Sequence, residues 1–165
     1  MAQVTFKGKA INTSGTLPAV GAKLPPFTLV GMDLVDISLE DCSGKSIVLN
    51  IFPSIDTPTC ALSVRTFNEK ASVTRDAGVL CVSMDLPFAA ARFCGAEGLS
   101  HVVPASAFRN HEFGIDYGLT MVDGPLKGLF ARAVIVANAA GEVVHVQLVP
   151  EISQEPDYAA ALNAL

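Results

Sequence analysis

Residues 47–60, IVLNIFPSIDTPTC, decide the fold because they join a buried strand to the start of a helix. The run IVLNIF is apolar and rich in β-branched residues over the length of one strand, which is typical of a strand covered on both faces. Pro53 ends this strand. Thr57 suits the N-cap of a helix, and Pro58 suits its first position. The segment therefore predicts a β-strand followed directly by an α-helix.

Outward from this segment, strands alternate with helices. After the N-cap, apolar residues recur at 60, 64, 67 and 71 along one helical face. We expect further strands at 4–6, 10–12, 27–30, 79–84, 102–103, 133–137 and 143–149, and further helices at 87–93, 109–117 and from 156 onward. The helix that begins at residue 87 should end at Gly95. The pattern predicts one α/β sandwich with a mixed sheet, a single domain over residues 1–165.

Composition narrows the function classes. The 165 residues are 50% hydrophobic and 16% charged, which excludes intrinsic disorder. A formal net charge of −5 argues against a nucleic-acid or anionic-membrane partner, because such partners bind clustered Lys and Arg. The N-terminus lacks the apolar core of a signal peptide, and the most apolar window is too short to span a bilayer. We therefore expect a cytoplasmic protein, whose four cysteines serve as core residues, metal ligands or redox groups.

Cys60 carries the clearest chemical signal. With Thr57 as N-cap it is the third helical residue, beside backbone N–H groups that lack an intrahelical partner. These groups and the positive helix end favour thiolate over thiol. Making an ordinary cysteine mostly anionic at neutral pH takes roughly 3.4 kcal/mol, for about 2.5 pKa units. A helix end typically supplies about 0.3–1 kcal/mol, so a cation or further hydrogen bonds must assist.

Each of these residues also has a plainer interpretation. Cys60 could be a small buried apolar residue, Thr57 only a helix cap and Pro53 only a strand terminator. Arg132 could be a surface or ion-pair arginine, although its apolar, strand-like surroundings favour a buried role. The combination of the residues gives the functional interpretation its weight.

Pro53, Thr57 and Cys60 match the P-x-x-x-T-x-x-C active-site pattern of the peroxiredoxins. Three further segments closely resemble bacterial thiol peroxidases, the atypical two-cysteine peroxiredoxins: SMDLPFAAARFC (83–94), DGPLKGLFARAVIV (123–136) and EISQEPDYAAAL (151–162). The resemblance runs nearly from end to end. It implies a thioredoxin-like sandwich with a mixed central sheet and an added N-terminal β-hairpin.

The resemblance also implies an activity and partners. These are the reduction of hydroperoxides, with alkyl hydroperoxides favoured and hydrogen peroxide also accepted, thioredoxin as electron donor, a homodimer and no cofactor. By position, Cys60 corresponds to the peroxidatic cysteine and Cys94 to the resolving cysteine of an intramolecular disulfide. Thr57, Pro53 and Arg132 correspond to the active-site threonine, proline and arginine.

The implied mechanism is an attack of the Cys60 thiolate on the terminal peroxide oxygen, which leaves a sulfenic acid. Arg132 and the Thr57 hydroxyl are the natural donors to the departing oxygen, while Pro53 shields the thiolate without offering an N–H. A disulfide needs Cα atoms within about 7 Å, whereas helix axes pack about 8–10 Å apart. Formation of the Cys60–Cys94 bond is therefore expected to require partial unwinding.

Other functions have weaker support. A thioredoxin-type disulfide oxidoreductase lacks its C-x-x-C motif here, and the three histidines are isolated from one another and from any cysteine pair at zinc spacing. A non-enzymatic redox sensor or partner-binding module that uses the same cysteine pair stays open. A sensor or binding module of this kind would consume peroxide slowly and substoichiometrically, whereas an enzyme would turn peroxide over steadily. Cys81 is expected to be a core residue, and Cys42 is ambiguous.

Overall fold

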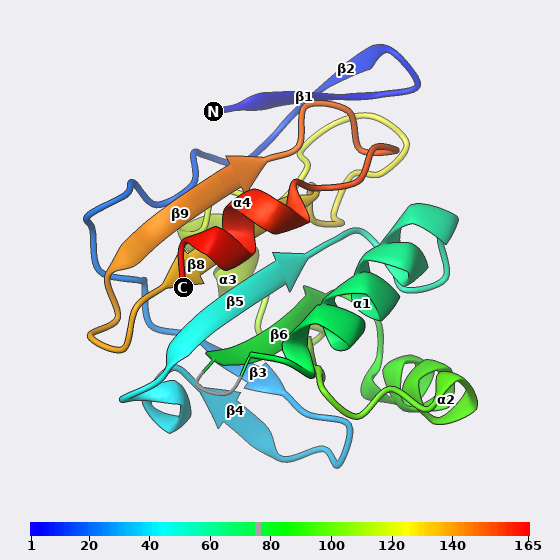
Figure 1. The fold of residues 1–165 in the computed structure, drawn as a ribbon. Helices are drawn as coiled ribbons and strands as arrows, with labels where there is room; N and C mark the ends of the chain where they lie inside the picture. The colour runs from blue at the N-terminus through cyan, green and yellow to red at the C-terminus, as the bar shows by residue number, and fades with distance from the viewer. Residues whose placement is uncertain (75–76) are drawn as a thin grey trace.

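The computed structural model describes residues 1–74 and 77–165, and it has the α/β architecture that the sequence predicts (Figure 1). In chain order the elements are β1 (Gln3–Phe6), β2 (Lys9–Asn12), β3 (Thr28–Val30), β4 (Asp36–Ser38), the 3₁₀ turn η1 (Glu40–Cys42), β5 (Ser46–Ile51), α1 (Pro58–Ala71), β6 (Ala77–Ser83), α2 (Pro87–Glu97), β7 (Val103–Ser106), α3 (Glu112–Asp116), β8 (Ala133–Ala137), β9 (Val143–Leu148) and α4 (Tyr158–Asn163). Within the described residues, no helix has the length and apolar character needed to cross a membrane.

Seven of the described strands form one mixed sheet in the order β4-β3-β7-β6-β5-β8-β9. β5 runs parallel to β6 and antiparallel to β8, which places it inside the sheet. Every side chain of the run IVLNIF is buried, because elements cover both faces of this strand. The expectation of a strand buried on two sides is confirmed.

The two faces of the sheet carry separate cores. Leu49 and Ile51 of β5 pack with Phe113 of α3 on one face. Val48, which directly precedes Leu49, contributes to the other face, where residues of α1, α2 and α4 complete the core. Figure 1 shows α1 and α4 lying across that second face. This arrangement confirms the thioredoxin-like sandwich, and it sets the Cys60 and Cys94 helices on the same side of the sheet.

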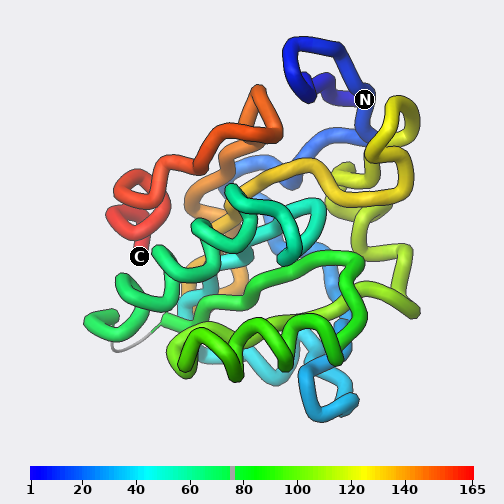
Figure 2. The backbone as a smooth tube through the Cα atoms, turned by 90° about the vertical axis from the view of Figure 1, so that its right-hand side faces the viewer, coloured from blue at the N-terminus to red at the C-terminus, as the bar shows by residue number. Residues whose placement is uncertain are grey.

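The N-terminal hairpin is also confirmed. β1 and β2 pair antiparallel, from Gln3 opposite Asn12 to Phe6 opposite Lys9, and form a two-stranded sheet of their own. Lys7 and Gly8 make the turn with φ of 52° and 76°, a left-handed backbone that suits a tight hairpin. Figure 2 shows the hairpin at one end of the molecule, well separated from α2.

Several sequence-based boundaries are wrong. The strand expected at 102–103 is β7 at Val103–Ser106, the helix expected at 109–117 is α3 at Glu112–Asp116, and the last helix begins at Tyr158 rather than at 156. α2 does not end at Gly95 but continues to Glu97, since the residues after Gly95 accept helical geometry. Gly98 ends it instead, with φ of 66° and its N–H donating to the Cys94 carbonyl. The short edge strand β4 and the turn η1 were not expected, because three-residue elements carry too little periodicity to be recognised.

Candidate active site

The connection from β5 to α1 positions the cysteine. The backbone stays paired one residue beyond β5, where the Phe52 N–H donates to the Val82 carbonyl across 3.1 Å. Pro53 is buried and turns the chain away from the sheet. Pro58 is the first residue of α1 and Cys60 the third, as the sequence predicts. Cys60 has no exposed surface.

Strand register brings Arg132 to the same place. Ala133, the first residue of β8, lies opposite Ile51, the last residue of β5. The residue before Ala133 therefore meets the chain just after β5, next to the start of α1. Arg132 is 1% exposed, and its Nη2 donates to the Cys60 sulfur across 3.3 Å. A guanidinium stays charged at any physiological pH, so this contact supplies the cation that a helix end alone cannot replace.

The guanidinium is fixed on its other side. Its Nε donates to the Ile152 carbonyl across 2.9 Å. Nη1 is buried and has no hydrogen-bond partner among the residues that the structure describes. Because an unpaired buried N–H is costly, this atom is suited to a ligand oxygen. One planar side chain therefore offers a bond to sulfur, an anchor and one free donor.

A cavity of about 280 Å³ opens beside this arginine. Its lining is mostly apolar and comes from the hairpin, the β5–α1 connection, the loop before β8 and the segment after β9: Phe6, Lys7, Pro53, Ser54, Thr57, Pro58, Thr59, Leu126, Leu129, Arg132, Ile152 and Ser153. The cavity thus brings together Pro53, Thr57 and Arg132, as the sequence argument expects. Cys60 is not among the lining residues, and its link to the cavity is the contact with Arg132.

Thr57 departs from its expected role as a side-chain cap. It occupies the N-cap position, with φ of −105° and ψ of 147°, but its hydroxyl makes no capping bond. The hydroxyl donates to the Ser54 carbonyl across 3.1 Å instead. The proton is therefore engaged, and the oxygen lone pairs are free to accept a hydrogen bond. The Thr57 hydroxyl is therefore suited to accept a hydrogen bond from a ligand O–H, and not to donate one to the departing oxygen as the sequence argument expects.

Sequence reasoning missed residues 151–153, the segment whose backbone binds Arg132. Glu151 attaches this segment to the N-terminal hairpin. The Glu151 carboxylate accepts bonds from the Ser153 and Thr5 hydroxyls at 2.7 and 2.8 Å and from the Lys7, Gly8 and Ser153 N–H groups at 3.1–3.2 Å. These bonds, with those of Ser153 and Thr5 first, lower the pKa of Glu151 to about 2.

The residues after Glu151 touch the site through backbone atoms. The Ile152 carbonyl anchors Arg132, and the Ser153 carbonyl accepts a bond from the Thr59 hydroxyl at 3.1 Å. No side-chain pattern signals a carbonyl contact of this kind. The only clue in the sequence was the segment 151–162, in which no individual residue had been given a role.

The second cysteine lies in the last turn of α2. Cys94 is 5% exposed and belongs to the same core cluster as Cys60. Both thiols are free. Burial raises the pKa of Cys94. Burial thus disfavours the Cys94 thiolate, and Cys94 packs on the same face of the sheet as Cys60.

The two remaining cysteines lie outside this arrangement. Cys81 in β6 is buried, and burial raises its pKa to about 12, so its expected place in the core is confirmed. Cys42 is half-buried, and its pKa is raised by burial and by the nearby Asp41.

Comparison with known proteins identifies the class that this fold and site define. The chain matches the Redoxin family over residues 19–162, and it belongs to that family. It is 62% identical to a thiol peroxidase of Mycobacterium tuberculosis, over all of this chain and 99% of the relative. A thiol peroxidase of Corynebacterium glutamicum is 54% identical over the same shares of the two chains.

A solved structure supports the same family assignment. The crystal structure of a peroxiredoxin-like protein from Aquifex aeolicus superimposes with a TM-score of 0.93 at 37% identity, covering 99% of this chain and 95% of the other. These similarities confirm the resemblance to the peroxiredoxins and, within them, to thiol peroxidases.

Proposed function

We propose that this peroxiredoxin-type peroxidase reduces hydroperoxides through a sulfenic acid on Cys60, and that Cys94 resolves this acid to an intramolecular disulfide. The observation that carries the proposal is the position of Arg132, which contacts the Cys60 sulfur with Nη2 and keeps Nη1 unpaired beside the cavity. A group placed in this way stabilises a thiolate and a departing oxygen together.

In the first step the Cys60 thiolate attacks the terminal oxygen of ROOH. An S–O bond forms and the O–O bond breaks, which oxidises the sulfur to the sulfenic acid. The alkoxide takes a proton from water and leaves as ROH. Thr57 accepts a hydrogen bond from the peroxide O–H, because its own proton is engaged by the Ser54 carbonyl. Arg132 Nη1 donates to the oxygen on which charge develops. Pro53 borders the cavity without adding a competing N–H.

The cavity supports a preference for alkyl hydroperoxides over hydrogen peroxide. Phe6, Leu126, Leu129 and Ile152 give it an apolar wall that can bury an organic substituent. Each buried CH₂ group contributes about 0.8 kcal/mol, which hydrogen peroxide cannot gain. A bulky substrate such as cumene hydroperoxide should therefore have the lower KM.

Resolution joins the sulfenic acid to the Cys94 thiol and releases water. Thioredoxin then reduces the disulfide. Because burial raises the pKa of Cys94, its thiolate is the poorer leaving group. Attack on Cys94 expels the Cys60 thiolate instead, next to the Arg132 guanidinium that stabilises it. A thioredoxin that lacks its second cysteine should form its mixed disulfide at Cys94, and trapping mainly at Cys60 would reverse this assignment.

The decisive experiment is peroxide turnover coupled to NADPH through thioredoxin and its reductase. Wild-type protein should turn over steadily, Cys60→Ser should be inactive, and Cys94→Ser should consume one equivalent of peroxide and stop. Slow, substoichiometric consumption by the wild type would favour the redox-sensor alternative. Cys42→Ser is the control, because that residue lies outside the site and should keep full turnover.

We also propose a homodimer in the cytoplasm, on the strength of the family resemblance. Large apolar side chains on the surface support an interface, among them Phe88 at 64% and Ile115 at 63% exposure. Analytical ultracentrifugation of the reduced protein should give twice the mass of one chain. A monomer at micromolar concentration would contradict the proposal.

A further inference from the structure

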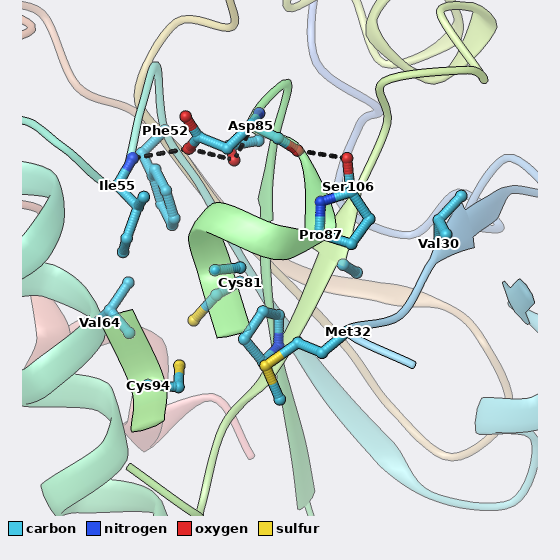
Figure 3. Close-up of a pocket in the computed structure, with 14 residues that line it drawn as sticks. Val30, Met32, Phe52, Ile55, Val64, Cys81, Asp85, Pro87, Cys94 and Ser106 are labelled. Carbon is cyan, nitrogen blue, oxygen red and sulfur yellow. Dashed lines mark hydrogen bonds between the residues drawn. The ribbon is translucent and has the colours of Figure 1, made fainter. Parts of the chain in front are cut away.

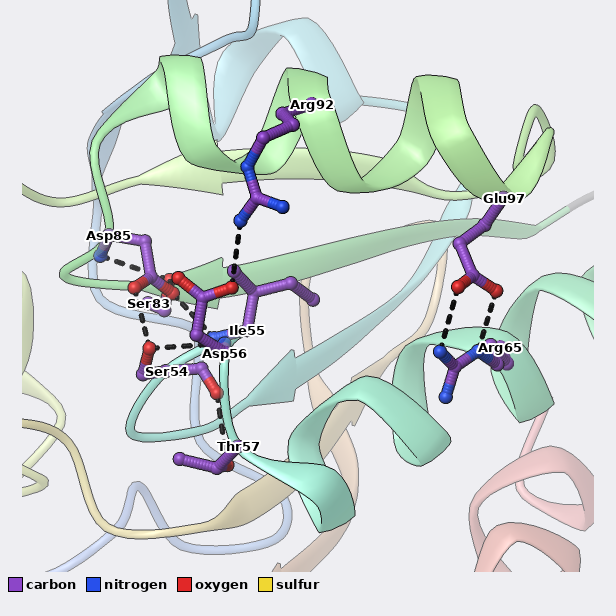
Figure 4. A network of polar contacts seen from close by, with 9 residues as sticks. All are labelled: Ser54, Ile55, Asp56, Thr57, Arg65, Ser83, Asp85, Arg92 and Glu97. Carbon is purple, nitrogen blue, oxygen red and sulfur yellow. Dashed lines mark hydrogen bonds and ion pairs between the residues drawn. The ribbon is translucent and has the colours of Figure 1, made fainter.

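Besides the core, one carboxylate links the two segments that carry Cys60 and Cys94. Asp85 lies in the turn between β6 and α2, two residues before the first residue of the Cys94 helix. Its Oδ1 accepts a bond from the Ser54 hydroxyl at 2.8 Å, and its Oδ2 accepts from the Ile55 N–H at 2.7 Å. Ser54 and Ile55 belong to the connection that leads into α1. Figure 4 shows these bonds converging on the carboxylate.

Asp85 is itself held firmly. Its Oδ2 also accepts from the Ser83 hydroxyl at 2.7 Å, and its backbone carbonyl accepts from the Ser106 hydroxyl. Both serines are buried at the ends of sheet strands, and Figure 3 shows Ser106 beside Asp85. The carboxylate is therefore fixed at the C-terminal ends of β6 and β7, and the β5–α1 connection is the partner that is more easily displaced.

Further hydrogen bonds connect Ser54 to Thr57, and Thr57 to the first turn of α1. The Ser54 carbonyl accepts from both the Thr57 hydroxyl and the Thr57 N–H. The Thr57 carbonyl then accepts the first helical bond of α1, from Ala61. Releasing Ser54 and Ile55 would loosen Thr57 and the first turn of α1 together.

Two ion pairs also cross between these segments, but they contribute less. Asp56 pairs with Arg92 at 2.9 Å, and Arg65 pairs with Glu97 at 2.7 Å (Figure 4). All four side chains are substantially exposed, and water screens such pairs. The Ile55 N–H is different, because Ile55 is 5% exposed and its amide relies on Asp85.

We propose that Asp85 is a positioning residue that holds the β5–α1 connection closed and so sets the fate of the Cys60 sulfenic acid; this rests on the function proposed above. In the closed arrangement a second ROOH can oxidise the sulfenic acid to sulfinic acid, releasing ROH. Once the first turn of α1 opens, the Cys94 thiol condenses with the sulfenic acid, releasing water. Asp85 favours the closed arrangement, in which Thr57 and Arg132 are aligned, and slows the opening.

Removal of the carboxylate should therefore change the two steps in opposite directions. In Asp85→Ala, stopped-flow kinetics should show slower formation of the sulfenic acid and faster formation of the disulfide, each by about tenfold, because the bonds from Ser54 and Ile55 to the carboxylate are both lost. The peroxide concentration that inactivates half of the enzyme during turnover should rise. Ser54→Ala, which removes one of the bonds to Asp85, should show the same pattern more weakly if Asp85→Ala fails to fold.

The matched control is Asp41→Ala. Asp41 also accepts one backbone N–H and one serine hydroxyl, both from Ser38 at 2.8 Å, but it lies in η1, away from the cysteine segments. It should leave both rates unchanged. Arg92→Gln should change them by less than Asp85→Ala.

The outcomes separate the two proposals. If mass spectrometry of the wild type after one equivalent of peroxide finds no Cys60–Cys94 disulfide, the proposed function fails. If that disulfide forms, but Asp85→Ala and Ser54→Ala alter both rates in the same direction or not at all, Asp85 is not a positioning residue.

Discussion

The Arg132 guanidinium lies 3.3 Å from the Cys60 sulfur and is held there by the Ile152 carbonyl. Three parts of the chain that are distant in sequence thus meet at one guanidinium. The planar shape of the guanidinium lets one side chain contact the sulfur and the carbonyl at once. The ability of Arg132 to stabilise negative charge therefore depends on the position of the guanidinium as much as on its charge.

Replacing Arg132 should therefore lower kcat/KM even when the positive charge is kept. Arg132→Met should lower kcat/KM for cumene hydroperoxide by about 10²–10³, the usual effect of removing a donor to a developing oxyanion. Arg132→Lys should recover little, because one ammonium cannot reach the carbonyl, the sulfur and a peroxide together. Arg109→Met, which removes an exposed ion pair with Asp36, is the control. Unchanged kinetics in Arg132→Met would exclude the arginine from the mechanism.

The direction of the Thr57 hydroxyl can be tested separately. Thr57→Val keeps the side-chain shape but removes the acceptor, so kcat/KM should fall about 10- to 100-fold for one lost hydrogen bond to a reacting group. Thr57→Ser keeps the oxygen and should retain most activity. Steady-state assays with both variants decide the point, and a fully active Thr57→Val would refute an acceptor role.

Glu151 predicts a loss of stability in acid. Its pKa is about 2 in the folded protein, below the ordinary 4.5, so between these values the unfolded chain binds more protons. The stabilisation is complete above about pH 4.5 and is lost as the pH falls through about 2. Urea unfolding of wild type and Glu151→Gln should therefore differ most near neutral pH and converge in acid. A constant difference across this range would contradict the assignment, and Glu40→Gln serves as the control.

Two glycines separate backbone strain from a steric clash. A Cβ on Gly118 would lie 2.4 Å from the Thr16 backbone, whereas one on Gly141 would meet nothing within 4 Å. Both have positive φ, of 66° and 75°. Gly141→Ala should cost about 1–2 kcal/mol of unfolding free energy for the left-handed backbone. Gly118→Ala should cost roughly 1–3 kcal/mol more, for the overpacking. Equal losses in urea unfolding would show that Thr16 moves aside freely.

The sequence predicts what depends on local pattern. The run IVLNIF identifies the central strand, and Thr57 with Pro58 identifies the start of α1, because backbone preference and burial act within a few residues. The family resemblance also selects Pro53 and Arg132, which the structure brings to one cavity. Their proximity depends on the pairing of β5 with β8, a long-range register that no local window contains.

The unpredicted features are those set by tertiary contacts. The Thr57 hydroxyl donates to Ser54 rather than capping α1, and the Ile152 carbonyl anchors the arginine. Asp85 lies within a recognised segment, yet its bonds to Ser54 and Ile55 depend on how β6 meets the β5–α1 connection. Single amino-acid identities do not encode such contacts.

The anchoring of Arg132 by Ile152 has a consequence for biosynthesis. A nascent chain that has only emerged from the ribosome as far as α3 already contains both Cys60 and Cys94, but neither the guanidinium nor its carbonyl anchor. Until nearly the whole polypeptide has been made, Cys60 is a cysteine without its cation. On the function proposed above, full reactivity of Cys60 toward peroxide should therefore arise only after Arg132 has been synthesised and positioned.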